Sequence, residues 1–324
     1  MPISMNNIPS DLRVPLFYAE VDNSQANSGT SSMPRLIVAQ VNDDATAAEI
    51  GQLTLVPTLS LATAIGGVGS MLAQMYETWR RSDPAGEVWC LPIKATGVKA
   101  SGSLTVTGTA TEGGVLNLYI AGARVRATVV KGATSAMVAS ALAAAVNAAG
   151  LSVTAVAALG VVTLTCKWSG VTGNDIALQL NRLGRSNGET TPDGLNVVMA
   201  FMANGAGSPD VAMALASLGD EPFEFICAPW ADADALNAWK AFMDDSAGRW
   251  SWAKQLYGHV YTAQRGTLGE LVALSATRND QHATIHGFEA LCPDPVWNVA
   301  AAYAARTAVF ISADPARPTQ TGEL

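Results

Sequence analysis

The chain has 324 residues, of which 49% are hydrophobic and only 14% are charged. A chain of this length and composition can bury a substantial core, and the length suggests about two domains. The net charge is −8 and the basic residues form no cluster along the sequence beyond pairs such as Arg80 and Arg81. This argues against nucleic acid as a partner, because phosphate binding needs concentrated positive charge.

The first stretch with strand character is Leu12 to Tyr18, where apolar residues nearly alternate with others. Pro9 and Pro15 interrupt it, and a proline restricts a strand to a sheet edge or to an isolated arm. We therefore expect residues 1–34 to form an extended N-terminal arm. The start of the chain lacks the basic and apolar regions of a secretion signal.

The next segments predict a strand, a helix and a second strand. Residues 36–41 (LIVAQV) are an apolar run of strand length, and 88–93 (VWCLPI) are another. Between them a helix begins near Ser70, because Met71, Met75 and Trp79 recur at intervals of four. The uncharged stretch before this helix contains proline and several glycines, which favours a buried loop and helix over a membrane span. The order of elements predicts a parallel α/β sheet.

The pattern then changes to closely spaced strands. Thr134 is a candidate N-cap for one helix, which Gly150 would end, and a hairpin turn is expected at Ala121 to Ala123. Small polar linkers at 94–103 and 182–194 bracket this region, so we expect 96–194 to be an inserted β-rich domain. The strands are predicted at 103–109, 115–121, 124–130, 151–158, 161–168 and 175–181.

After the second linker, strands and helices alternate again. Pro209 is expected in a first helical turn, and Asp232 or Asp234 at a helix cap. Residues 35–95 and 195–324 would then form a discontinuous α/β core, so the predicted fold class is an α/β core with an inserted β-rich (α+β) domain and an extended N-terminal arm. Strands are expected at 195–201, 223–229, 256–262 and 284–290, with helices at 209–218, 233–245, 268–278 and 296–311.

Two short motifs could indicate a hydrolase. Residues 184–188 (GRSNG) match the G-x-S-x-G nucleophile elbow, but another strand follows where that motif requires a helix. A catalytic Ser186 would also need a base, and nothing local selects among His259, His282 and His286. The last two have a spacing used in metal sites, yet the metalloprotease glutamate is missing and the segment is strand-like. We therefore expect no catalytic and no metal-binding residues.

Phosphate-binding loops are missing as well. Residues 204–210 (NGAGSPD) lack the third glycine of a dinucleotide loop, 66–70 (GGVGS) lack a lysine, and no P-loop motif occurs. We therefore expect no cofactor.

The cysteines are expected to be mostly buried, and the tryptophans to pack in the core or at a subunit interface. The cysteines have irregular spacings typical of reduced thiols. Four tryptophans crowd an acidic region, which favours core or subunit-interface packing over nucleic-acid stacking. The residues are Cys90, Cys166, Cys227 and Cys292, and Trp230, Trp239, Trp250 and Trp252.

Taken together, several blocks resemble the tail sheath protein of contractile-tailed, Mu-like bacteriophages. The opening ISMNNIPSDLRVPLFYAEVDNSQAN (3–27) looks like the N-terminal signature of that family. Residues 67–93 are similar to its next block, and 113–129 with 160–181 resemble its inserted domain. The blocks similar to its α/β core are 205–232, 244–267 and 278–285.

The resemblance implies a structural subunit that polymerises with itself, as hexameric rings stacked helically around a tail tube. Its other partners would be the tail tube, baseplate and tail terminator proteins, with no nucleic acid and no direct membrane insertion. The sheath would be assembled in the host cytoplasm, become part of the virion tail, and contract to drive the tube through the host envelope. The arm residues that would contact a neighbouring subunit, by strand addition, are Leu12, Val14, Leu16, Phe17 and Tyr18.

Sheath proteins of this type continue beyond the segment that corresponds to 314–324, so the resemblance also implies that a C-terminal region is missing. Two other classes stay open from the sequence. One is a serine- or metal-dependent hydrolase that uses Ser186 or the pair His282 and His286. The other is a non-contractile tail or baseplate protein, which would form closed oligomers rather than tubes.

Overall fold

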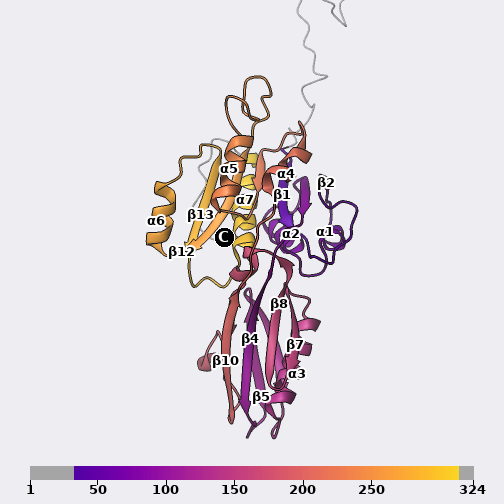
Figure 1. Ribbon diagram of the computed structural model, residues 1–324, viewed down its shortest axis with the longest axis vertical. Coiled ribbons are helices and arrows are strands. Elements are labelled where there is room, and N and C mark those ends of the chain that lie inside the picture. The colour runs from indigo at the N-terminus through magenta and orange to yellow at the C-terminus, as the bar shows by residue number, and fades with distance from the viewer. Residues whose placement is uncertain (1–32, 314–324) are drawn as a thin grey trace, which may run out of the picture. The chain divides into compact units, whose positions relative to one another are not determined.

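Strand β1 (Arg35–Gln40) lies inside a six-stranded sheet in the computed structural model, which describes residues 33–313. The strand order is β13-β12-β11-β1-β3-β2 (Figure 1). All neighbours are parallel except the edge strand β2 (Thr54–Leu55), which is antiparallel to β3. The remaining strands are β3 (Val88–Ile93), β11 (Phe225–Cys227), β12 (His259–Gly266) and β13 (Ala283–Glu289).

The inner strands of this sheet are apolar because both of their faces are covered. Leu36, Ile37 and Val38 in β1 are fully buried, as are Cys90 and Leu91 in β3. Continuous apolar runs are typical of parallel strands that lie between layers of helices. The predicted strands at 36–41 and 88–93, and their parallel pairing, are therefore confirmed.

The predicted helix stripe is also confirmed. In α2 (Met71–Ser82) the side chains of Met71, Met75 and Trp79 are fully buried, and the hydroxyl oxygen of Ser70 accepts a hydrogen bond from the Ala73 amide at 3.2 Å. Helices α2 and α7 (Val296–Ala313) pack side by side. The preceding helix α1 (Leu59–Gly66) was not predicted as a separate element.

Between β3 and β11 the chain forms two antiparallel sheets, which Figure 1 shows below the six-stranded sheet. One has the order β10-β4-β8-β7 and the other β6-β5-β9, and α3 (Ser135–Ala148) contacts both. The strands are β4 (Lys99–Gly108), β5 (Gly114–Ile120), β6 (Ala123–Val129), β7 (Val153–Ala158), β8 (Val161–Ser169), β9 (Leu178–Leu180) and β10 (Leu195–Ala203).

The local signals predicted in this region are confirmed. Thr134 caps α3, and its hydroxyl oxygen accepts from the Met137 amide. Ala121 and Gly122 have φ values of 49° and 79° and connect β5 to β6. Positive φ at both central residues is the geometry of a two-residue hairpin turn, which fits the twist of the flanking strands.

One strand lies in a different sheet from the predicted one. Residues 195–203 form β10, which pairs with β4 rather than with the parallel sheet. Its residues alternate between half-buried and exposed from Leu195 to Ala200, as expected of an antiparallel strand with one face toward solvent. The apolar composition of the run hid this alternation, and placing the strand in the α/β core was wrong.

Smaller differences concern the ends of elements. Strand β4 begins at Lys99, inside the predicted linker, because its alternate residues are buried. Pro209 precedes α4 (Val211–Leu215), which Asp210 caps. Asp232, and not Asp234, caps α5 (Ala233–Phe242). The predicted arm residues 12–18 lie outside the described residues.

Candidate functional site

The end of β1 is joined to the antiparallel sheets by buried polar contacts. The side chain of Gln40 is fully buried, its amide nitrogen donates to the Ser169 carbonyl at 3.0 Å, and its oxygen accepts from the Thr172 hydroxyl at 2.8 Å. Nearby, the rings of Trp168 and Trp297 meet edge to face with centroids 5.4 Å apart, and both are fully buried. Residues 96–205, which we call the module, are therefore docked on the core by interior-like packing.

A second contact between the module and the core is ionic. Arg265 at the end of β12 pairs with Asp175 in the short helix η1 (Val171–Asp175), with 2.6 Å between Nε and Oδ1. The same carboxylate accepts from the Val296 amide at the start of α7. Arg265 also donates to the carbonyls of Ala290, Cys292 and Asp294.

Burial raises the pKa of Asp175 above its ordinary value, and Arg265 opposes that shift. A partly buried carboxylate with a guanidinium and an amide as partners is held in one geometry.

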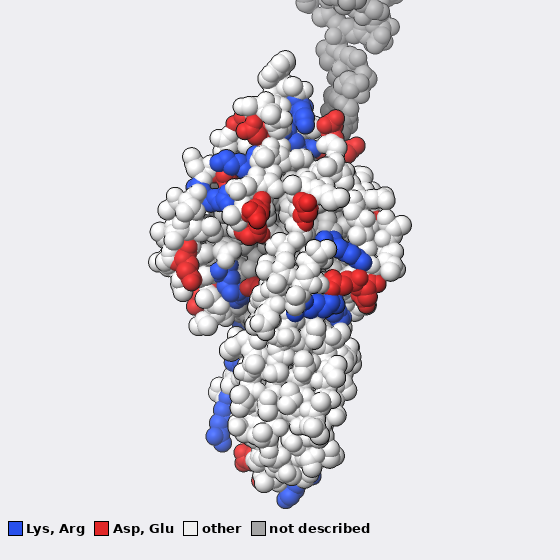
Figure 2. Space-filling view, in the orientation of Figure 1, with Lys and Arg blue, Asp and Glu red and all other residues white. Residues whose placement is uncertain are grey.

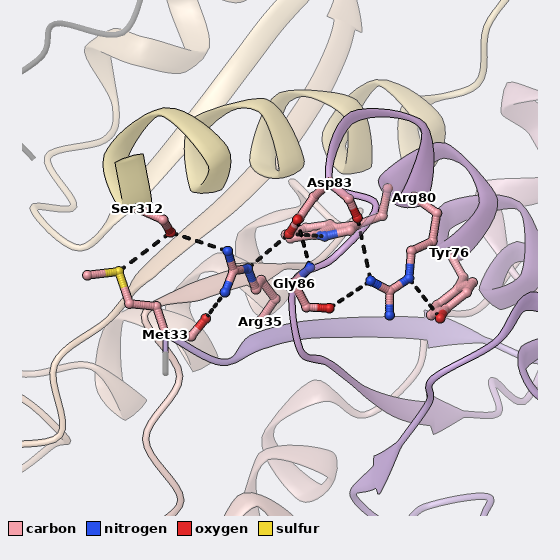
Figure 3. Close-up of polar contacts among 8 residues, drawn as sticks. Met33, Arg35, Tyr76, Arg80, Asp83, Gly86 and Ser312 are labelled. Atoms are coloured by element: carbon pink, nitrogen blue, oxygen red, sulfur yellow. Dashed lines mark hydrogen bonds and ion pairs between the residues drawn. The ribbon is translucent and has the colours of Figure 1, made fainter. Parts of the chain in front are cut away.

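A third cluster lies where β1 begins, next to residues 1–32 in the chain (Figure 3). Arg35 donates from Nε to Asp83 at 3.0 Å, and its other nitrogens donate to the Met33 carbonyl and the Ser312 hydroxyl. Asp83 also accepts from the Trp79 indole and the Gly86 amide. Arg35 thus holds the first described residues beside the last turn of α7.

Arg80 supports the neighbouring loop in the same cluster. It donates to the Gly86 carbonyl at 2.6 Å and to the Tyr76 hydroxyl at 2.8 Å (Figure 3). Tyr76 in turn donates to the Val56 carbonyl. These contacts fix the connection between α2 and β3.

Among residues 33–313, strand β13 is an open edge of the six-stranded sheet, because β12 is its one partner there. Beside it in the chain lies α6 (Leu268–Ala276), which has no buried residue, although a capping box between Thr267 and Glu270 stabilises its start. Leu268 is 79% exposed and Val272 is 57% exposed. An unpaired strand next to exposed apolar side chains is typical of a surface that another chain covers.

A crevice of about 700 Å³ lies at the carboxyl ends of β11 and β12, where open α/β sheets commonly bind ligands. Its charged lining consists of Asp175, Asp232, Glu270 and Arg265. Because Arg265 is already paired, the excess of carboxylates disfavours a phosphate-bearing ligand.

The structure does not support the serine motif as a nucleophile. Ser186 is exposed in a 3₁₀ turn, η2 (Arg185–Asn187), and its recorded hydrogen-bond partner is the Asn187 side chain at 3.4 Å. A nucleophile elbow requires a strand of the parallel sheet before the serine and a helix after it. Ser186 has neither.

The three histidines have separate partners. His259 lies 2.8 Å from the Thr284 hydroxyl, His282 lies 2.8 Å from an Asp245 oxygen, and His286 stacks on Tyr303. Within residues 33–313 no group of three or more His, Cys, Asp or Glu side chains could hold a metal ion. Over the same range, no helix combines the length and the apolar character that a membrane crossing needs.

The cysteines are mostly buried, as expected, and of the four tryptophans two are buried, Trp250 is half-buried and Trp252 is exposed. Three thiols are buried, whereas Cys292 is partly exposed. Burial raises the pKa of Cys90 and Cys227, and that of Cys166 to about 12. Trp230 and Trp239 are buried, but Trp252 is 85% exposed.

Comparison with known proteins relates most of the chain to one group. Residues 204–324 match a family model described as the phage tail sheath protein central domain. The chain is 37% identical to the Mu-like prophage FluMu tail sheath protein of Haemophilus influenzae, over 99% of this chain and 65% of that protein. The chain therefore spans less than two thirds of the length of this relative.

Among solved structures, the crystal structure of the sheath tail protein Lin1278 from Listeria innocua matches with a TM-score of 0.30. It is 13% identical, and the match covers 85% of this chain and 56% of that chain.

Proposed function

We propose that the chain is a phage tail sheath protein, a structural subunit of a contractile tail. Copies polymerise helically around a tail tube, and the polymer contracts to drive that tube through the host envelope. The observation that carries the proposal is the 37% identity over 99% of the chain. Such agreement along nearly every element leaves little of the sequence outside the resemblance.

The domain layout fits a subunit that carries an appendage. Residues 1–34 form the linking arm, and the six-stranded sheet with its helices forms the core. The module is inserted between β3 and β11, with β10 included in it. Buried contacts at Gln40, Trp168 and Asp175 support a module that moves together with the core when the polymer changes length.

The arm residues Leu12, Val14, Leu16, Phe17 and Tyr18 join neighbouring subunits by strand addition. In residues 33–313, β13 is the long open edge of the core sheet, since β2 at the other edge has two residues. Main-chain hydrogen bonds would supply affinity, and alternate side chains would supply specificity. Because such a contact joins two different surfaces, it extends the polymer instead of closing it.

A structural role also agrees with the scattered positions of the catalytic candidates. Ser186 lies in the module, whereas the histidines lie on core strands or beside them and bind separate partners. Contraction of this kind draws its free energy from repeated interfaces, so no nucleotide is required.

Electron microscopy tests the proposal. We expect concentrated protein, with the tail tube protein supplied, to form striated tubes, and a variant without residues 1–30 to remain folded but unassembled. Circular dichroism and the unfolding transition establish that the deletion variant is folded. Isolated particles from the intact chain under every condition would contradict the proposal, and tubes from the deletion variant would contradict the role of the arm.

A further inference from the structure

Charge is divided unevenly between the module and the rest of the chain. The module contains seven basic and four acidic residues, a net charge of +3, whereas the whole chain carries −8. The rest of the chain therefore carries −11. In Figure 2 acidic residues are frequent over the core, while the module is mostly uncharged with basic residues at its margins.

A buried carboxylate of the module, Glu189, pairs with Arg124 and holds a loop that carries two further arginines. The side chain of Glu189 is 3% exposed, and it accepts hydrogen bonds from the Tyr119 hydroxyl, the Leu183 amide and Arg124. These contacts bind the loop at 182–188 to strands β5 and β6. We call Arg124, Arg126, Arg182 and Arg185 the arginine patch.

The pairing of β5 with β6 on one side and β9 on the other brings Arg124 and Arg126 near the segment that carries Arg182. Arg124 and Arg126 lie on the outer face of β6, opposite Tyr119 and Asn117 of β5. On the other side of β5, the Asn181 amide donates to the Asn117 carbonyl, and Arg182 follows directly. Neighbouring strands lie about 4.8 Å apart, so the backbones of Arg126 and Asn181 are separated by roughly 10 Å.

The arginine patch carries more positive charge than its one acidic partner, Glu189, neutralises. All four arginines are exposed. Arg124 pairs with Glu189, whereas Arg126, Arg182 and Arg185 occur in none of the ion pairs recorded within residues 33–313. Exposed, unpaired guanidinium groups are suited to carboxylate recognition, because their planar fork matches two oxygens.

The same chain presents a complementary acidic surface. Around α4 and α5, the exposed acidic side chains are Asp210, Asp220, Glu221, Asp232 and Asp234. The single basic residue between 210 and 245, Lys240, already pairs with Asp280. Figure 1 shows α4 and α5 in the core, and Asp232 at the start of α5 lines the crevice that Thr172 and Asp175 of the module also line.

We propose that the arginine patch of one copy binds the acidic α4–α5 surface of a second copy. Charge complementarity within one sequence favours a copy of this chain over a foreign polyanion, because the core of the chain would repel a polyanion. The two surfaces are different parts of the chain, so the contact is heterologous and can propagate from copy to copy without closing. The inference rests on the proposed function, since it specifies one contact of the polymer.

The contact is electrostatic and therefore depends on salt. At 0.15 M ionic strength, exposed charges are screened beyond about 8 Å. We expect the concentration needed for assembly to rise at least tenfold in the triple variant Arg126→Glu, Arg182→Glu and Arg185→Glu. A tenfold change corresponds to about 1.4 kcal/mol per contact. Wild-type assembly should become weaker as salt increases.

A matched control has the same change of net charge elsewhere. The variant Arg81→Glu, Lys254→Glu and Arg306→Glu alters three exposed residues outside the module and should assemble like the wild type. Adding Asp220→Lys, Glu221→Lys and Asp234→Lys to the reversed patch should restore assembly. Exposed substitutions change the unfolding free energy by about 0.5 kcal/mol or less, so misfolding does not explain the expected differences.

A second measurement does not require tubes. A photo-crosslinking amino acid at position 185, in a mixture of ¹⁴N- and ¹⁵N-labelled chains at low salt, should link to residues 210–245 of another copy. Links elsewhere or no intermolecular links would overturn the inference, as would equal assembly of the reversed-patch variant. If the protein instead binds short duplex DNA through the arginine patch and forms no copy-to-copy links, the partner of the patch is a polyanion. Failure of the intact chain to form tubes, with these links present, would overturn only the proposed function.

Discussion

Arg265 Nε lies 2.6 Å from Asp175 Oδ1, across the junction between the core and the module. Each side chain is only 17% exposed. The pair therefore experiences less screening than a surface ion pair, and the removal of one partner leaves the other partly buried without its counter-charge.

The first prediction concerns this pair. Arg265→Ala should lower the free energy of unfolding by about 3 kcal/mol, because a buried pair broken on one side is strongly destabilising. Urea denaturation measures the change. The control Arg81→Ala, whose side chain is 71% exposed beside Glu77, should change it by less than about 1 kcal/mol. Equal effects of the two substitutions would show that the junction does not depend on the pair.

The second prediction concerns pH. Burial, with a smaller effect from His282, lowers the pKa of His259 from 6.5 to about 4. The unfolded chain then binds a proton that the folded chain excludes, so stability falls as pH falls from about 6.5 toward 4. In His259→Gln the unfolding free energy should depend less steeply on pH in this window. Parallel profiles for variant and wild type would rule out His259 as the source.

The third prediction concerns thiol reactivity. Cys90, Cys166 and Cys227 are buried and have raised pKa values, whereas Cys292 is partly exposed. Since the thiolate is the reactive form, one thiol per chain should react quickly with a disulfide reagent, and that reaction should disappear in Cys292→Ser. The other three should react only in denaturant. Fast reaction of two or more thiols in the folded protein would contradict the packing around β1, β3 and β11.

The fourth prediction separates a structural protein from a hydrolase. A fluorophosphonate, which labels activated serines, should not modify Ser186, and Ser186→Ala should leave assembly unchanged. The physical reason is that no recorded contact joins the Ser186 hydroxyl to a histidine base. Mass spectrometry of the labelled protein gives the answer, with trypsin as the positive control. Labelling at Ser186 that disappears in Ser186→Ala would support the hydrolase interpretation instead.

The sequence predicted most elements because their signals are local. The stripe of Met71, Met75 and Trp79 and the cap at Thr134 depend on residues within one or two helical turns. Strand β10 was placed in the wrong sheet because its partner, β4, is about ninety residues earlier in the chain. An apolar run predicts a strand, but it does not specify which sheet the strand joins.

The contacts that we propose to be functional could not be predicted from the sequence. Arg35 and Ser312 come together only through the packing of α7 against α2, β11 and β12. The arginine patch combines residues from β6 with residues from the loop after β9, so a search for basic clusters along the chain does not find it. The buried Glu189 that organises this patch resembles any other acidic loop residue in the sequence.

Arg35 has a mechanical consequence. The Arg35 guanidinium donates hydrogen bonds to both Met33 and Ser312. A force applied to the two ends of the described chain therefore acts on this guanidinium and on the segments next to it. The module leaves the core after β3 and returns before β11, so it lies outside this load path. Tension can therefore pass from one end of the described chain to the other without stretching the module.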